Sequence, residues 1–166
     1  MRRLTSTMQL LKADIKHIKA LQQAFAESED LLHPWVSEPA DYRAYVKEPH
    51  RYLILNDAQQ LLGTLCISGI IQGAFQSAYL GYNLFTPFNG QGNMHKALQL
   101  ALTKVFTELN LHRLEANIQP DNLASIRLVE KLGFKREGYS EKYLFINGAW
   151  RDHVRYALVK ENWLEN

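Results

Sequence analysis

Cysteine is almost absent from this sequence. Cys66 is the only one among 166 residues, which excludes an intrachain disulfide and fits a reducing compartment. It stands in the apolar run LLGTLCISGII at 61–71, where a buried structural thiol is expected, and nothing around it is typical of a catalytic cysteine.

Long apolar runs and strong net charge are also missing. The N-terminal MRRLTSTMQLLKADI has no uninterrupted apolar segment of signal-peptide length, and no stretch of the sequence is long enough to span a bilayer. A net charge of +2 gives no reason to expect nucleic acid or a membrane as partner. The six histidines show no metal-ligand spacing such as H-E-x-x-H. We therefore expect a cytoplasmic protein that needs no metal.

The sequence does contain alternating strand-like and helix-like segments, in a length and apolar share (46%) that suit one domain, 1–166. Helix capping is expected at Asp14 and Gly133, and a tight hairpin turn at Asn147-Gly148. Strands are expected at 1–12, 51–57, 61–71, 74–85, 112–118, 139–148 and 149–159, a loop at 31–39, and helices at 14–28, 41–48, 93–109 and 122–134.

This order of elements predicts the fold class. An antiparallel start followed by a β-α-β-α-β crossover indicates an α+β domain with a mixed, mostly antiparallel central sheet. Helices are expected on both faces, with the apolar stripes of 93–109 and 122–132 covering one face each.

Two glycines stand two residues apart in FNGQGNM (88–94), between a strand and a helix. The first N–H groups of a helix are unpaired and carry partial positive charge, and glycines let the main chain approach a ligand closely. Together these features suit a pyrophosphate, although a simple tight turn explains the glycines equally well. The segment lacks the Lys-Ser/Thr of a P-loop and the third glycine of the dinucleotide fingerprint, which argues against an oxidoreductase.

Three longer segments extend this pattern. YLGYNLFTPFNGQGNMHKAL (79–98), RLEANIQPDNLAS (113–125) and LVEKLGFKREGY (128–139) together resemble the GNAT acetyltransferase superfamily. The likeness covers roughly residues 60–160 and is strongest to the ribosomal-protein N-terminal acetyltransferases of the RimJ/RimL type. IIQGAFQSAYLGY, EGYSEKYLFINGAWRDHV and LLHPW carry that subgroup likeness. Asn89 departs from the usual Gln or Arg, and Met94 from the usual Gly or Ala.

The resemblance implies a GNAT fold and a co-substrate, acetyl-CoA. The sheet would splay between two parallel strands, 79–85 and 112–118, and the co-substrate would lie between them. Its pantetheine arm would pair with main chain, and its pyrophosphate would contact the glycine loop. Asn122 also suits a helix cap, and Leu84 and Phe85 also suit the sheet core. The implied cofactor-binding residues are Leu84, Phe85, Asn89, Gly90, Gln91, Gly92, Asn93, Met94, Asn122 and Ser125.

Acetyl transfer to an amine needs a neutral nucleophile, a stabilised oxyanion and a proton for the departing thiolate. Many GNAT enzymes supply that proton from a Tyr, but the matching position here is Val129. In the subgroup a Ser is the proposed donor, and Ser125 occupies its place, where it also suits a bond to a backbone carbonyl. For the base, Glu115 and Asn117 lie on one face of a strand. Asn117 would hold a water, and Glu115 would either accept the proton or pair with Arg113.

The acceptor side of the site is expected at the HPWVSEP loop. His33 and Trp35 would wall the channel and Tyr82 would line it, although core packing is an equal interpretation of Trp35. The expected reaction is direct transfer in a ternary complex to a primary amine. A protein N-terminal amine of the ribosomal type is favoured over a small amine, and the fold alone does not decide. A non-catalytic acyl-CoA-binding module is the rival, and the chain would act as a monomer or homodimer.

Overall fold

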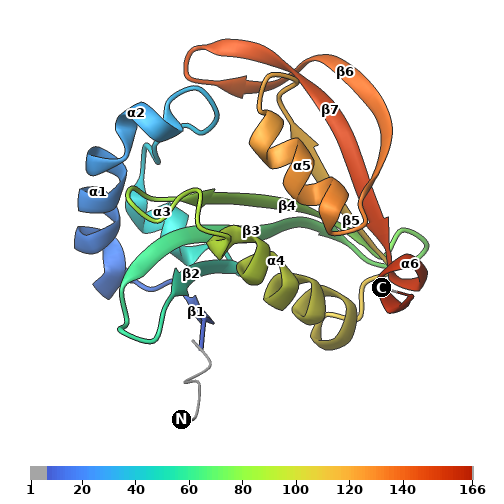
Figure 1. The fold of residues 1–166 in the computed structure, drawn as a ribbon, viewed down its shortest axis with the longest axis horizontal. Helices are drawn as coiled ribbons and strands as arrows, with labels where there is room; N and C mark the ends of the chain where they lie inside the picture. Colours follow the sequence, from blue (N-terminus) through green and yellow to red (C-terminus); the bar gives the residue numbers. More distant parts are fainter. Residues whose placement is uncertain (1–6, 166) are drawn as a thin grey trace.

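An open seven-stranded sheet forms the centre of the computed structural model, which describes residues 7–165 (Figure 1). Neighbouring strands run antiparallel except for the one parallel pair, β4 and β5. The sheet order is β1-β2-β3-β4-β5-β7-β6. The strands are β1 (Gln9–Lys12), β2 (Arg51–Leu55), β3 (Leu61–Ile71), β4 (Ser77–Leu84), β5 (Arg113–Ile118), β6 (Lys135–Ile146) and β7 (Ala149–Val159).

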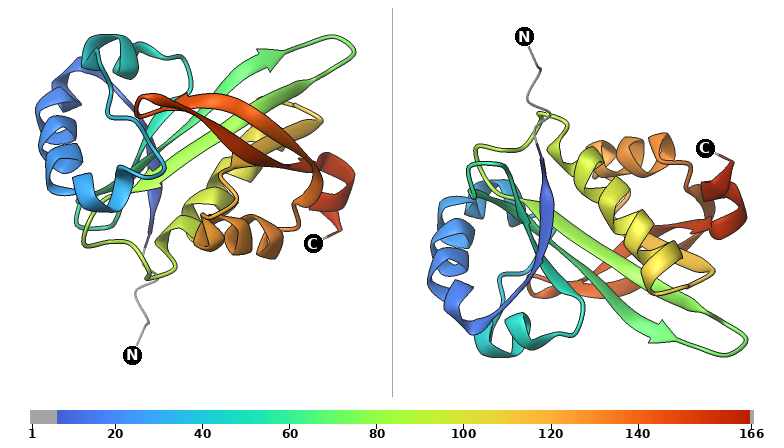
Figure 2. Two further views of the ribbon diagram at one scale, coloured as in Figure 1. Left: turned by 90° about the horizontal axis from the view of Figure 1, so that it is seen from above. Right: turned by 90° about the horizontal axis from the view of Figure 1, so that it is seen from below.

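Helices cover both faces of this sheet, as the views from above and below show (Figure 2). No helix within residues 7–165 is long and apolar enough to cross a membrane. The helical elements are η1 (Ile15–His17), α1 (Ile18–Glu27), α2 (Glu29–Leu32), α3 (Tyr42–Lys47), α4 (Asn93–Thr103), the π-helical turn η2 (Lys104–Glu108), α5 (Leu123–Lys131) and α6 (Lys160–Leu164).

Two separate apolar cores fill the two sides of the sheet. On one side α4 and α5 pack together, with Leu98 and Val129 buried in the same cluster as Leu65 of β3. On the other side Leu21 of α1 and Val46 of α3 belong to a second cluster. The expectation that the helices 93–109 and 122–132 cover opposite faces was therefore wrong, since α1 to α3 form the second layer.

The connection rule gives the physical reason for this correction. From β4 to β5, and again from β5 to β6, the chain moves in the same direction across the sheet and returns to a parallel strand. Two right-handed crossovers that advance in one direction must place their helices on the same face. The apolar stripe of each helix shows which side of the helix is buried. It does not show which face of the sheet that side packs against.

The parallel pair β4 and β5 stays together for only a short distance. Ser77 to Tyr79 pair with Arg113 to Glu115, and the pairing then ends. Beyond that point β4 stays paired with β3 as far as Leu84, and β5 stays paired with β7 as far as Ile118. The expected splay between these two strands is confirmed, and it leaves a gap in the middle of the sheet.

Local signals in the sequence located several element ends. The Asp14 carboxylate accepts from the N–H of Lys16 at 3.2 Å and caps η1, as expected. Gly133 has φ +92° after α5, and Asn147 and Gly148 have φ +48° and +82° in the β6–β7 turn.

Other boundaries differ from the expectation. α2 replaces part of the loop at 31–39, β6 begins at Lys135 rather than at 139, and α6 was not expected. Residues 1–6 of the expected first strand lie outside the described residues, and β1 begins at Gln9.

We expect Gly63→Ala to destabilise the fold, because a Cβ at this position would lie 2.2 Å from the main-chain oxygen of Asn83 on β4. Relieving that overlap requires the two strands to separate, so the free energy of unfolding should fall by about 1–3 kcal/mol. Gly81→Ala is the matched control, since a Cβ there meets nothing within 4 Å, and its stability should change by less than about 0.5 kcal/mol. Urea denaturation measures both, and equal losses would contradict the crowding at Gly63.

Candidate active site

A cavity of about 850 Å³ lies where β4 and β5 part. This volume is in the range of pockets that hold a cofactor or drug-sized ligand. Its wall is shared by the two diverging strands, the glycine loop, the first turns of α4 and α5, the 31–37 segment and the β6–β7 hairpin. From the strands, the lining includes Leu80, Gly81, Tyr82, Asn83 and Leu84 of β4 and Ala116, Asn117 and Ile118 of β5.

The edge of β4 that faces this cavity offers main-chain hydrogen-bonding groups. The N–H of Phe85 donates to the Leu62 carbonyl at 2.8 Å, so this group points toward β3. Because successive residues of a strand direct their main-chain groups to opposite edges, those of Leu84 point to the cavity side. Leu84 also lines the cavity, whereas Phe85 is 1% exposed and packs on Phe25 with ring centroids 5.1 Å apart.

The glycine loop leaves open space above its main chain. Gly90 and Gly92 have φ +72° and +76°, and a Cβ built on either meets nothing within 4 Å. Their conformation, and not crowding by protein atoms, is therefore what favours glycine. Two side chains of the loop bind its own main chain: Gln91 donates to the Pro87 carbonyl at 2.9 Å, and Asn93 donates to the Phe88 carbonyl at 3.0 Å.

The helix that follows this loop begins without a side-chain cap. Gly92 is the N-cap of α4 and makes no capping bond, whereas Asp41 and Asn122 cap α3 and α5 with their side chains. The first N–H groups of α4 are thus left for a ligand, and they carry the positive end of the helix dipole. Met94 is buried in the core at this helix start and also reaches the cavity wall, while Asn89 lines the cavity.

A hydroxyl pair lies where α5 meets β4. The Ser125 Oγ and Tyr82 Oη atoms are 2.6 Å apart, and both side chains line the cavity. Burial raises the pKa of Tyr82 to about 12, so the phenol keeps its proton at neutral pH. Asn122 holds the start of α5 by accepting from the Ser125 N–H at 3.3 Å. Val129 is fully buried in the core and offers no group for chemistry.

Two amide side chains lie on the face of β4 and β5 opposite to the Tyr82–Ser125 pair, and each has one atom without a partner. Asn83 Nδ2 and Asn117 Oδ1 are buried and form no hydrogen bond within residues 7–165. Thr64 donates its single hydroxyl proton to Asn83 Oδ1 at 2.8 Å, so the Tyr45 hydroxyl, also at 2.8 Å, must donate to Thr64. These two hydrogen bonds fix the orientation of the Asn83 amide, so that its NH₂ group points away from Thr64. The sequence signal for Asn83 was a polar residue inside the apolar run 78–85.

Glu115 does not line the cavity. Arg113 donates to its carboxylate at 3.1 and 3.0 Å, and also binds Glu137. This hydrogen bond from Arg113 lowers the pKa of Glu137. The pairing with Arg113 that the sequence left open is the arrangement observed, and Asn117 is the residue of this strand face that reaches the cavity.

The 31–37 segment and the β6–β7 turn lie side by side (Figure 1), and both contribute residues to the cavity lining. The Asn147 side chain donates to the carbonyl of His33, and Gln119 Nε2 donates to the Pro34 carbonyl at 3.0 Å. Trp35 lines the cavity, whereas the His33 side chain is exposed and does not. The segment therefore forms a bridge between the α1–α3 layer and the hairpin.

Charge inside the cavity is balanced. Among its lining residues, Glu48 is the carboxylate and Arg51 the guanidinium, and they form an ion pair at 2.5 Å. Cys66 donates its thiol proton to Glu48 at 3.2 Å, and burial raises the thiol pKa to about 12, so it is not nucleophilic at neutral pH. No three His, Cys, Asp or Glu side chains of residues 7–165 are grouped as a metal ion requires.

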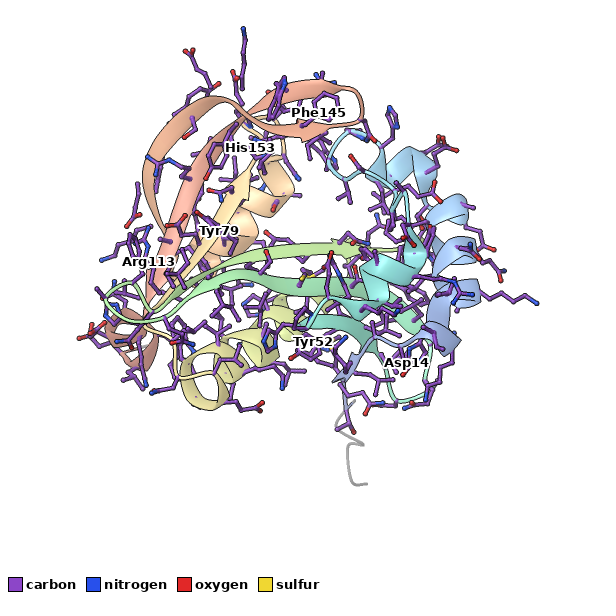
Figure 3. All side chains as sticks on the ribbon, turned by 180° about the vertical axis from the view of Figure 1, so that it is seen from behind. Asp14, Tyr52, Tyr79, Arg113, Phe145 and His153 are labelled. Atoms are coloured by element: carbon purple, nitrogen blue, oxygen red, sulfur yellow. The ribbon has the colours of Figure 1, made fainter. Side chains whose placement is uncertain are left out.

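His153 of β7 is a lining residue that the sequence analysis missed. Its ring, labelled in Figure 3, is 3% exposed. Its Nδ1 lies 2.9 Å from the Arg151 carbonyl oxygen. Nothing in the spacing of WRDHVRY marks this histidine. Strand alternation predicts which residues share a face with His153, but not that this face lines a cavity.

Comparison with known proteins agrees with this geometry. Residues 8–135 match a family model described as an acetyltransferase (GNAT) domain. The probable N-acetyltransferase YjcK of Bacillus subtilis is 42% identical over 113 residues, which are 68% of this chain and 62% of that protein. The match thus spans less than two thirds of YjcK.

Two further relatives match over more of their length. The ribosomal protein uS5-alanine N-acetyltransferase of Escherichia coli is 32% identical over 160 residues, which are 86% of this chain and 82% of that protein. The structure of Mycobacterium smegmatis RimJ in complex with CoA-disulfide aligns with a TM-score of 0.81 at 26% identity, covering 93% of this chain and 82% of that one.

We expect Gly92→Ala to weaken coenzyme A binding at least tenfold. A side chain at φ +76° strains the loop by roughly 1–2 kcal/mol and turns the first N–H groups of α4 away from a bound diphosphate. Gly73→Ala is the matched control, since Gly73 has φ +70° and equally open surroundings in the β3–β4 turn. In calorimetric titration the Gly73→Ala control should bind coenzyme A with wild-type affinity. Its free energy of unfolding should fall about as much as that of Gly92→Ala. An equal loss of affinity in both variants would contradict a binding role for the loop.

Proposed function

This chain belongs to the GNAT acetyltransferase family, and from that premise we propose that it transfers the acetyl group of acetyl-CoA directly to a primary amine. The favoured acceptor is the N-terminal α-amine of a protein of the ribosomal type. One observation carries the proposal: a single cavity joins an uncapped, glycine-flanked helix start to a channel between two parted strands that contains the unpartnered amides of Asn83 and Asn117. We expect the reaction in the cytoplasm, a reducing compartment that fits the single Cys66.

Acetyl-CoA supplies an activated acetyl thioester, and the residues present fit its parts. The open main chain at Gly90 and Gly92 and the uncapped start of α4 suit the diphosphate. The main-chain groups of Leu84 suit the amide-bearing arm, which would add to the free edge of β4 like a further strand. Asn122 contributes through the helix cap that holds Ser125 in place.

The chemistry of the channel favours a peptide over a polyamine. The Glu48 carboxylate is neutralised by Arg51, so the lining offers a polycation no free negative charge. The unpaired atoms are instead a donor, Asn83 Nδ2, and an acceptor, Asn117 Oδ1. A peptide N-terminus presents an amine and a carbonyl group on neighbouring carbons, and can satisfy both. The relative that modifies an alanine of a ribosomal protein supports the same choice.

We assign protonation of the leaving sulfur to Ser125 and Tyr82. Both residues line the cavity, and the Ser125 hydroxyl lies 2.6 Å from the protonated Tyr82 phenol. Ser125 donates its proton to the sulfur and Tyr82 replaces it, so a weakly acidic serine is backed by a phenol. This relay provides what the absent Tyr at position 129 would have provided. It also argues against a module that only binds acyl-CoA.

Turnover of defined acceptors tests the function. Thiol release from acetyl-CoA should be observed with short peptides that begin with Ala or Ser, and should be absent with the same peptides already N-acetylated. Spermidine should be turned over at least tenfold less efficiently. Binding of coenzyme A without turnover of any amine would identify a non-catalytic acyl-CoA-binding module instead. A preference for spermidine would identify a small-amine acetyltransferase.

Substitution of the hydroxyl pair tests the relay. Ser125→Ala should lower kcat by roughly 10²–10³-fold, the usual contribution of a general acid, while the affinity for coenzyme A changes little. Tyr82→Phe should lower kcat less, and the double variant should be no slower than Ser125→Ala, since the two groups move one proton. Tyr139→Phe is the control, because its hydroxyl binds Asp152 outside the cavity. Additive losses in the double variant would contradict a shared path.

A further inference from the structure

His153 has its ring orientation and tautomer set by the main chain. Its Nδ1 lies 2.9 Å from the carbonyl oxygen of Arg151, and a carbonyl can only accept a hydrogen bond. The hydrogen of the neutral imidazole is therefore on Nδ1. The lone pair of the ring is then on Nε2, the atom that accepts a proton.

The position of His153 on β7 directs this ring to the acceptor side of the cleft. Arg155 stands opposite Asn117 in the β5–β7 ladder, and His153, two residues from Arg155, shares that face. The ring is 3% exposed and lines the cavity, and no residue within 7–165 hydrogen-bonds to Nε2. The same cavity wall holds Asn117, whose Oδ1 is also unpartnered.

Competing bases near this face already have partners. Glu115 binds Arg113, and the Glu48 carboxylate binds Arg51. Asp152, the sequence neighbour of His153, accepts from Tyr139 Oη at 2.6 Å and from the Lys142 N–H at 2.8 Å.

The remaining titratable and charged groups near His153 are few. Tyr143 on β6 has its ring centroid 6.0 Å from the imidazole, and burial raises the pKa of its phenol. Arg155 is the cation on the same face of β7. The other imidazole of the cavity, His95, belongs to the first turn of α4, at the glycine-loop end.

We propose that His153 is the catalytic base that deprotonates the acceptor amine, directly or through one water held by Asn117. This assignment rests on the proposed function. The proton of the R–NH₃⁺ group moves to Nε2, and the freed nitrogen lone pair forms the new C–N bond as the C–S bond breaks. The sulfur takes its proton from the Ser125–Tyr82 pair, which regains one from water. The nitrogen loses its second proton to water, and His153 returns the first to solvent. Acetyl-CoA and R–NH₃⁺ thus give the acetylamide, coenzyme A and one H⁺.

His153→Asn is the sharpest variant, because an Asn amide can still donate to the Arg151 carbonyl but has no basic atom at the Nε2 position. At pH 6.5, kcat with an Ala-starting peptide should fall by roughly 10²-fold, within the range for general base catalysis. The loss should shrink as the pH rises to about 9, where a peptide α-amine with a pKa near 8 is neutral without help. A merely structural histidine predicts a loss that is the same at every pH, and that result would overturn the proposal.

A matched control variant and one measurement that does not depend on turnover complete the test. His112→Asn changes a histidine that binds Glu161 on the surface, and it should leave kcat unchanged at every pH. Nitrogen-15 NMR of the free wild-type protein should show His153 with its hydrogen on Nδ1, and the opposite tautomer would contradict the assignment. Calorimetry with coenzyme A separates the two proposals: normal binding and peptide turnover with an unaffected His153→Asn variant would refute only the role of His153.

Discussion

The site depends on one constraint, the early end of pairing between two parallel strands. β4 and β5 share three residue pairs, Ser77 to Tyr79 with Arg113 to Glu115, and then separate while each stays bonded to its other neighbour. Main-chain groups in a sheet require partners, so the free edge of β4 beyond Tyr79 is a place where a ligand with amide groups can bind. The split also connects the two faces of the sheet, where the proposed co-substrate and acceptor would meet.

In the proposed reaction, two different layers supply the two halves of the site. The α4–α5 layer contributes the uncapped helix start and the Ser125–Tyr82 pair to the cavity lining. The α1–α3 layer and the β6–β7 hairpin contribute Trp35, the paired Glu48 and His153. The Asn147 side chain, bound to the 31–37 segment, connects these acceptor-side elements across the cleft. The groups proposed to bind the anion and those proposed to bind the amine therefore belong to different layers around one cavity.

Much of this arrangement could be predicted from local sequence, and the rest could not for physical reasons. Capping at Asp14 and the turn at Asn147 depend on neighbouring residues, so the pattern located them. The glycine loop could be predicted because positive φ angles favour glycine, and two glycines just before a helix are visible in the sequence. The placement of α4 and α5 on one face depends on strand order, which no local pattern contains. His153 was missed for the same reason, since only the assembled sheet brings β7 beside the acceptor side of the cleft.

Hydrogen exchange at two adjacent main-chain amides tests the central claim most directly. The Phe85 N–H already donates to Leu62, whereas strand alternation turns the Leu84 N–H toward the cleft. Saturation with coenzyme A should slow exchange at Leu84 and at the first amides of α4, and leave Phe85 nearly unchanged. Binding of coenzyme A with no added protection at Leu84 and in the first turn of α4 would show that the ligand does not occupy the gap between the parted strands.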